Sequence, residues 1–171
     1  MSNNNCSTNN CEDVHKLGDL IKDIDFGMLT TMDEDGSLRS RPMSVNGKVE
    51  FDGDIWFFTY GNSHKVIEAE NHPQVNVSFT DINKQNYVSL SGTAELVRDK
   101  AKIEELWLPE LKAWFPEGVD TPDIALLKIN GQKAEYWDGP SSMISHAVAL
   151  LKGMAGESPD IGENKKINLK H

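Results

Sequence analysis

The chain has 171 residues, of which 38 % are hydrophobic and 26 % are charged, and these values suit one domain with or without tails. Its formal net charge of −10 argues against nucleic acid or an anionic membrane as partner, because phosphate contacts require a basic face. The sequence shows no secretory leader and no apolar run near the roughly 20 residues of a membrane span, so we expect a cytoplasmic protein.

The N-terminal part is predicted to hold a leader, a helix and a hairpin. Residues 1–11 are rich in Asn, Ser and Thr, and we expect a disordered leader there. Apolar residues recur at three- and four-residue spacing over 12–24, which predicts an amphipathic helix. The next two segments, 26–32 and 37–45, are predicted strands joined by a turn that contains Gly36.

Short β segments dominate the rest of the chain. They are expected at 55–60, 74–81, 86–97, 124–129 and 133–138. The last two flank Asn-Gly-Gln, which predicts a hairpin.

Helices are predicted between some of these strands. We expect them at 64–72, at 99–115 with a break at Pro109, and at 141–156. The polar residues 156–171 are expected to form a tail, which leaves residues 12–155 as the folded domain. Antiparallel hairpins with inserted helices predict a mainly β (α+β) protein, a small barrel with peripheral helices.

Two arginines lie two residues apart in an otherwise acidic chain. Arg39 and Arg41 would face the same side of a strand, roughly 7 Å apart. Pro42 has no N–H for a sheet ladder, which places this stretch at an edge or at a strand end. This face is suited to hold an anion.

A second cationic position follows the strand at 55–60. Ser63 is well placed to cap a helix whose first-turn amides favour an anion, and Lys65 and a protonated His64 would add charge. Either pattern alone is common without a ligand, as a solvated strand face or a simple cap. Together, on consecutive strands, they favour one phosphate site between them.

The order of several segments resembles the pyridoxamine 5′-phosphate oxidase-like flavin-binding split barrels. The resemblance is strongest to the small bacterial general stress proteins, whose C-terminal tail is similar to "GENKKINL", and it covers residues 12–170. It is carried by "RSRPMSV", "IWFFTYGNSHK", "HPQVNVSF", "YVSLSGTAELV" and "AEYWDGP".

The resemblance implies a six-stranded antiparallel split β-barrel and a homodimer with FMN in two grooves at the dimer interface. It implies a flavin-lining role for the strand of Arg41, a phosphate-binding role for the start of the following helix, and an aromatic contact from the last strand. Tyr87 would come from the second subunit. The implied cofactor-binding residues are Arg39, Arg41, Pro42, Met43, Ser44, Phe58, Thr59, Ser63, His64, Lys65, Tyr87 and Trp137.

One stretch departs from the family pattern. True pyridoxamine phosphate oxidases carry an arginine and a histidine after the last strand, whereas this chain reads "WDGPSSMISHA", with serines and a methionine at these places. His146 comes too late to match, inside the helix expected at 141–156. The sequence therefore predicts a flavin-binding protein without vitamin B6 oxidase activity, and no metal site.

Three functions remain open at this point. The protein is a flavin-dependent oxidoreductase of unknown substrate and electron donor, a non-catalytic flavin-binding or stress-response module, or a deazaflavin- or haem-binding barrel. The cationic phosphate site favours FMN among these cofactors. No residue stands out as a general acid or base.

Overall fold

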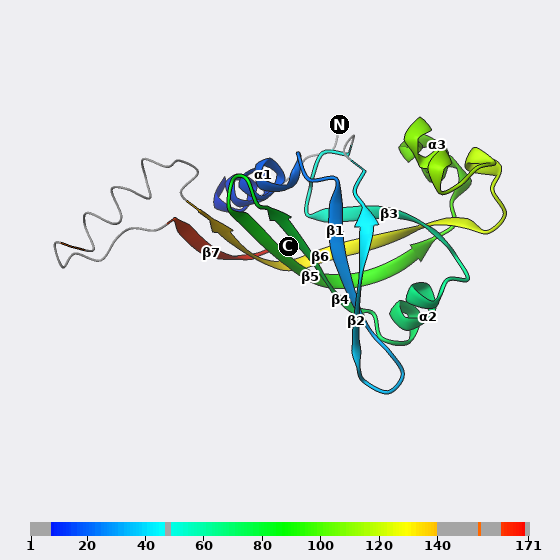
Figure 1. Cartoon of the computed structure of the whole chain (residues 1–171), viewed down its shortest axis with the longest axis horizontal. Helices are drawn as coiled ribbons and strands as arrows, with labels where there is room; N and C mark the ends of the chain where they lie inside the picture. Colours follow the sequence, from blue (N-terminus) through cyan, green and yellow to red (C-terminus); the bar gives the residue numbers. More distant parts are fainter. Residues whose placement is uncertain (1–7, 47–48, 140–153, 155–161, 170–171) are drawn as a thin grey trace.

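The computed structural model describes residues 8–46, 49–139, 154 and 162–169 (Figure 1). Helix α1 (Thr8–Ile21) begins four residues before the expected helix, within the segment assigned to the leader. The first turn is polar and lacks apolar periodicity, so the sequence pattern did not include it. Leu17, Leu20 and Ile21 are buried and pack this helix on the main core.

Among the described residues, seven strands form one antiparallel sheet, which confirms the predicted mainly β split barrel. Six of them follow one path in the order β2-β1-β4-β5-β6-β3, and β7 pairs with β6 outside it. The path is not closed, because β2 and β3 remain at its two ends. The strands are β1 (Phe26–Met32), β2 (Leu38–Ser44), β3 (Asp54–Tyr60), β4 (Gln74–Asp81), β5 (Asn86–Val97), β6 (Ile124–Asp138) and β7 (Glu163–Asn168).

The expected hairpin at Asn-Gly-Gln is wrong, since β6 runs unbroken through it. The register with β5 shifts there, because Ser91 pairs with Lys133 whereas the adjacent Gly92 pairs with Gly131. This bulge is held by a hydrogen bond of 3.1 Å from the Gly131 amide to the Gly53 carbonyl. Turn-forming residues thus bend one long strand, whose first half pairs with β3 and whose second half pairs with β7.

The C-terminal tail also differs from the expectation of a polar surface segment. Residues 163–168 form β7, and Ile167 lies opposite Ala134 of β6. Ile167 and Leu169 are buried in the main core although most of their neighbours are exposed. Two buried side chains in a polar stretch are too few to reveal a strand by alternation alone.

The remaining helices lie at the periphery of the sheet. They are α2 (His64–Asn71), α3 (Lys100–Leu106) and two 3₁₀ turns, η1 (Pro109–Ala113) and η2 (Gly118–Asp120). The predicted division of this segment is confirmed, since α3 ends at Leu106 and η1 begins at Pro109. The helix expected at 141–156 falls outside the described residues, apart from Met154.

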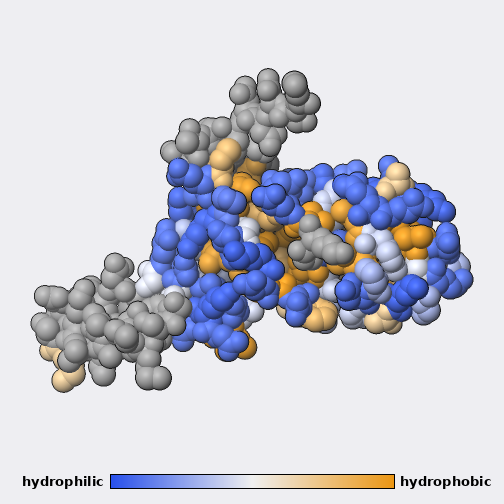
Figure 2. Space-filling view, turned by 90° about the horizontal axis from the view of Figure 1, so that it is seen from above, coloured by the Kyte–Doolittle hydropathy of each residue, from blue (hydrophilic) through white to orange (hydrophobic). Residues whose placement is uncertain are grey.

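Two buried clusters fill the fold. The larger lies between α1 and the sheet, and the smaller packs α3 and η1 against Phe58 and Leu126. Apolar side chains also gather in a hollow on the face seen in Figure 2, between hydrophilic flanks. Among the described helices, none is both long and apolar enough to cross a membrane.

Candidate functional site

The edge strand β2 presents Arg39 and Arg41 on one face, as the sequence predicted. Their cross-strand partners are Thr31 and Leu29, and directly paired residues share a face of the sheet. That face is the core face, because Leu29 and Thr31 are buried. Both arginines therefore lie at the open edge of the barrel and point toward its interior side.

The side chain that joins the two arginines is Glu68, which lies on α2 and is only 2 % exposed. The Arg41 guanidinium donates to Glu68 Oε2 at 2.8 Å, and Arg39 Nε lies 3.9 Å from Glu68 Oε1. His64 Nδ1 is 2.7 Å from the same carboxylate, and the Thr31 hydroxyl donates to it. This buried carboxylate thus organises the cations around it.

Glu68 stays ionised in this setting. Burial raises its pKa, but hydrogen bonds from Thr31 and His64 and the charge of Arg41 outweigh burial and hold the pKa below its ordinary value. Sequence reasoning missed this residue, because one glutamate among 27 acidic residues carries no signal. Its i,i+4 spacing from His64 was the only available hint.

The start of α2 lies beside the arginines. Ser63 occupies the N-cap position as predicted, but its hydroxyl makes no capping bond and instead lies 3.2 Å from the Thr59 hydroxyl. Lys65 is half-buried and, within the described part of the chain, has no carboxylate partner within ion-pair distance. Burial and the charge of Arg41 lower the pKa of Lys65.

The two cationic groups meet by a route that differs from the expected one. The sequence placed them on adjacent strands, whereas β2 and β3 lie at opposite ends of the sheet path. Helix α2 follows β3 and packs against β1 and β5, so its first turn reaches β2 from the side. The helix, and not strand pairing, therefore brings His64 and Lys65 to Arg41.

Several of the expected site residues lie elsewhere. Phe58 belongs to the smaller buried cluster, where its ring centroid is 5.6 Å from that of Trp107. Thr59 is buried next to Ser63, and Met43 is buried on the core face of β2. Pro42 and Ser44 alternate with Met43 and face the outer side.

Tyr87 and Trp137 form a separate aromatic pair. They are direct cross-strand partners on β5 and β6, and each is more than 40 % exposed. Their neighbours Val88 and Tyr136 are buried, so this pair lies on the outer face of the sheet. Within one chain, the pair and the cation cluster therefore occupy opposite faces.

Asp33, His64 and Glu68 come within 4.8 Å of one another, a spacing that suits metal ligands. The two carboxylates are already paired with arginines, because Arg39 donates to Asp33 at 3.0 Å and Arg41 to Glu68. Permanent cations on both carboxylates oppose a divalent ion there. The cluster of Arg39, Arg41 and Lys65 against two carboxylates instead carries one net positive charge, which suits an oxyanion.

Fold and cluster together define an open split barrel with a cluster of cations at one corner. A family model described as pyridoxamine 5′-phosphate oxidase like matches residues 12–160, and the chain belongs to this family. The resemblance noted in the sequence is thereby confirmed.

Relatives of this chain include proteins of the general stress group. The fold is similar to a Jannaschia sp. CCS1 protein assigned as general stress protein 26, with a TM-score of 0.75, 26 % identity and coverage of 92 % of this chain and 99 % of that one. It is also similar to the general stress FMN/FAD binding protein of Xanthomonas citri, with a TM-score of 0.66, 28 % identity and coverage of 77 % and 93 %. Protein bli-3 of Neurospora crassa is 24 % identical over 155 residues, which cover 85 % of this chain and 74 % of that protein.

Proposed function

We propose that this protein binds FMN, with the flavin phosphate at the start of α2 beside Arg41. The observation that carries the proposal is Lys65, a half-buried cation that has no carboxylate within ion-pair distance among the described residues. The relative from Xanthomonas citri, described as FMN/FAD binding, supports a flavin as the ligand.

The residues at this corner fit a phosphate group. Lys65 and Arg41 supply charge, and the Ser63 hydroxyl is close by. The amides of His64 and Lys65 precede the first hydrogen bond of α2, which the Val66 amide donates to the Ser63 carbonyl. Bound FMN would supply one- or two-electron chemistry at its ring, and this chain would hold and orient it. The cations at this corner suit a cofactor that bears a phosphate group, which favours FMN over haem. Deazaflavin stays open as an alternative cofactor.

The proposed site is completed by a second copy of the chain. Tyr87 and Trp137 lie on the outer face, away from the cations of their own chain, and Phe26 and Met28 are exposed on the same outer face of β1. A homodimer would cover these apolar side chains and bring the aromatic pair to the partner's flavin.

We further propose that the flavin exchanges electrons with a small molecule, so that the protein is an oxidoreductase. A non-catalytic flavin-binding module is the alternative. Anaerobic mixing of the FMN-loaded protein with NADH or NADPH separates the two, because bleaching of the flavin band requires hydride access to the ring. Vitamin B6 oxidase activity is not proposed, since the stretch after Trp137 lacks the family's arginine and histidine.

The first test measures FMN binding, by visible absorption of the flavin and by titration of the apo-protein with FMN. Arg41→Ala and Lys65→Ala should each weaken FMN binding by about 1–3 kcal/mol, the scale of a charge-assisted hydrogen bond. Riboflavin, which lacks the phosphate, should bind all variants alike. Lys112→Ala, an exposed change on η1, is the matched control.

Two results would contradict this assignment. Equal FMN affinity of the wild type and both site variants would remove the phosphate site from α2. An equal loss of riboflavin affinity would show that the substitutions disturb the fold and not a phosphate contact.

A further inference from the structure

We infer that a pocket beside the proposed flavin site takes a small aromatic ligand bearing a positive charge, and excludes anionic ones. The inference rests on the proposed function for the role of this ligand as a substrate. The pocket lies between the β1 and β2 ends and the η1 region, with a volume of about 380 Å³. That size suits a small molecule.

Apolar side chains from two parts of the chain form most of its lining. Phe26 and Phe58 come from the strands, and Leu108, Leu111 and Trp114 come from the segment around η1. Trp114 is 51 % exposed, so its ring is accessible at the pocket. Aromatic and aliphatic walls of this kind favour a flat apolar group.

The charged groups at the pocket are both acidic. Asp25 and Glu110 line it, and no lysine, arginine or histidine is among its lining residues in the described structure. Neither carboxylate has an ion-pair partner among the described residues, and both residues are exposed. Two unneutralised carboxylates attract a cation and repel a carboxylate or phosphate.

The position of the pocket links it to the flavin proposal. Ser44 and Phe58 line the pocket and also belong to the set expected to line the flavin. Both residues lie apart from the cation cluster at the start of α2, so a ligand in the pocket would meet the ring end of the flavin and not its phosphate. An acidic pocket at this place is the opposite of what a phosphorylated substrate requires.

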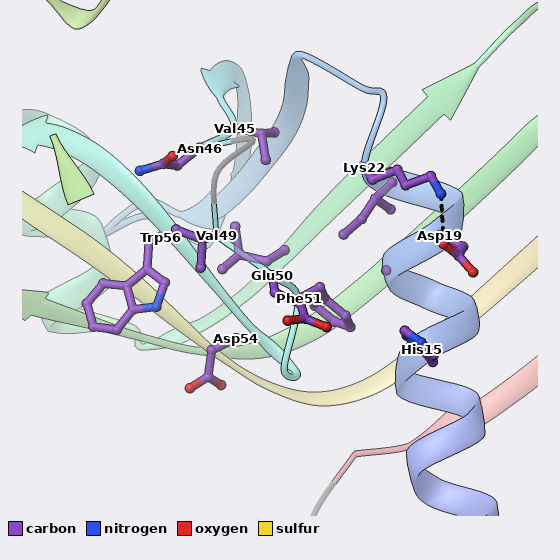
Figure 3. Close-up of a pocket in the computed structure, with 13 residues that line it drawn as sticks. His15, Asp19, Lys22, Val45, Asn46, Val49, Glu50, Phe51, Asp54 and Trp56 are labelled. Atoms are coloured by element: carbon purple, nitrogen blue, oxygen red, sulfur yellow. Dashed lines mark hydrogen bonds and ion pairs between the residues drawn. The ribbon is translucent and has the colours of Figure 1, made fainter. Parts of the chain in front are cut away.

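A second pocket, of about 350 Å³, is lined by both acidic and basic side chains. It lies between α1 and the segment 45–56, with the Asp19–Lys22 ion pair on its helix side (Figure 3). Its Asp54 is paired as well, with Lys128 at 2.8 Å. Glu50 lines this pocket without an ion pair among the described residues, but His15 and Lys22 line it as well. Because acidic and basic groups are mixed there, we expect a weaker preference for ligand charge, and this pocket serves as the internal control.

The test compares three ligands of one shape and different charge: benzylamine, benzyl alcohol and benzoate. Ligand-observed NMR and calorimetry would measure their binding to the protein with and without FMN. We expect benzylammonium to bind about tenfold more tightly than benzoate, the scale of one to two kcal/mol for two screened charges. Benzyl alcohol should fall between them.

Variants assign this preference to the pocket. The double change Asp25→Asn with Glu110→Gln should bring the three affinities together, while Asp19→Asn should leave the preference unchanged. Trp114→Ala should weaken all three ligands. Equal binding of benzoate and benzylammonium to the wild type, or an unchanged preference in the double variant, would overturn the inference.

The two proposals fail independently. If the protein binds no FMN but keeps the charge preference, the flavin assignment fails and the pocket remains. If FMN binds but the protein binds benzylamine, benzyl alcohol and benzoate with equal affinity, only the pocket assignment fails.

Discussion

Two of the three arginines of this chain meet the carboxylate of Glu68, and a third contact to it comes from His64. A buried carboxylate beside an anion site opposes the ligand by its charge. It also holds the Arg41 guanidinium in one orientation, with further N–H groups left for a ligand. The cluster is therefore ordered without a ligand, although the charge of Glu68 reduces its electrostatic attraction for an anion.

Glu68→Gln should reduce the free energy of unfolding by about 1–3 kcal/mol near neutral pH, because a buried charged hydrogen-bond network is lost. The folded-state pKa of Glu68 lies below its ordinary 4.5, so its stabilisation is present above that value. It disappears as the pH falls through the lowered pKa. Urea unfolding at about pH 7 and about pH 3 would measure the difference.

Glu70→Gln, an exposed change on the same helix, is the control for this experiment. A constant offset between wild type and Glu68→Gln at both pH values would show that the ionised carboxylate is not what stabilises the fold.

The cationic half of the site was predictable because cations are scarce here. Arg39 and Arg41 stand out in a chain of net charge −10, and Ser63 to Lys65 mark a helix start. Glu68 was not predictable, since its burial depends on how α2 packs on β1 and β5. The separation of Phe58 from the cations was hidden as well, because Phe57 and Phe58 face different clusters on one strand.

At the level of elements, β-forming residues, apolar runs and turn signals located six strands. Strict alternation marks only some of them, because β3 buries Phe57 and Phe58 on opposite faces. The prediction of strand ends failed where residues typical of a turn lie inside a strand. Asn130 and Gly131 read as a turn, yet Gly131 is needed because a Cβ there would lie 2.1 Å from the Gly53 carbonyl oxygen. The strand bends at this glycine and continues.

Ile167 of β7 and Leu169, directly after the strand, pack on the main core. Ile167→Ala should lower the free energy of unfolding by about 2–4 kcal/mol, since it leaves a cavity against the main core. Lys166→Ala, an exposed change one residue earlier, should be nearly neutral. Denaturant unfolding of both variants measures the difference, and equal stabilities would mean that β7 adds little to the core.

For the whole molecule, the proposed dimer has a definite interface. Trp137→Glu should convert a species of twice the 19.1 kDa chain mass into a monomer, because a charge replaces an apolar contact on the outer face. The same change should lower the affinity for FMN and for riboflavin by similar factors, because the aromatic contact is lost while the cation cluster at the start of α2 is kept. Sedimentation velocity and flavin titration measure the two effects.

Leu38→Glu is the matched control, because Leu38 is more exposed than Trp137 and lies near the hairpin between β1 and β2. A wild-type monomer, or a variant that remains a dimer with normal flavin affinity, would contradict the interface.

The open seam of the barrel has one more consequence. A strand at the end of a sheet offers unpaired backbone groups to other chains, and β2 is such a strand. Its guanidinium groups and the missing N–H of Pro42 make it a poor template for strand addition. Uncharged replacements at Arg39, Arg41 and Pro42 together would leave a free edge open to intermolecular β-pairing. The residues proposed to hold an anion would therefore also protect the protein against aggregation.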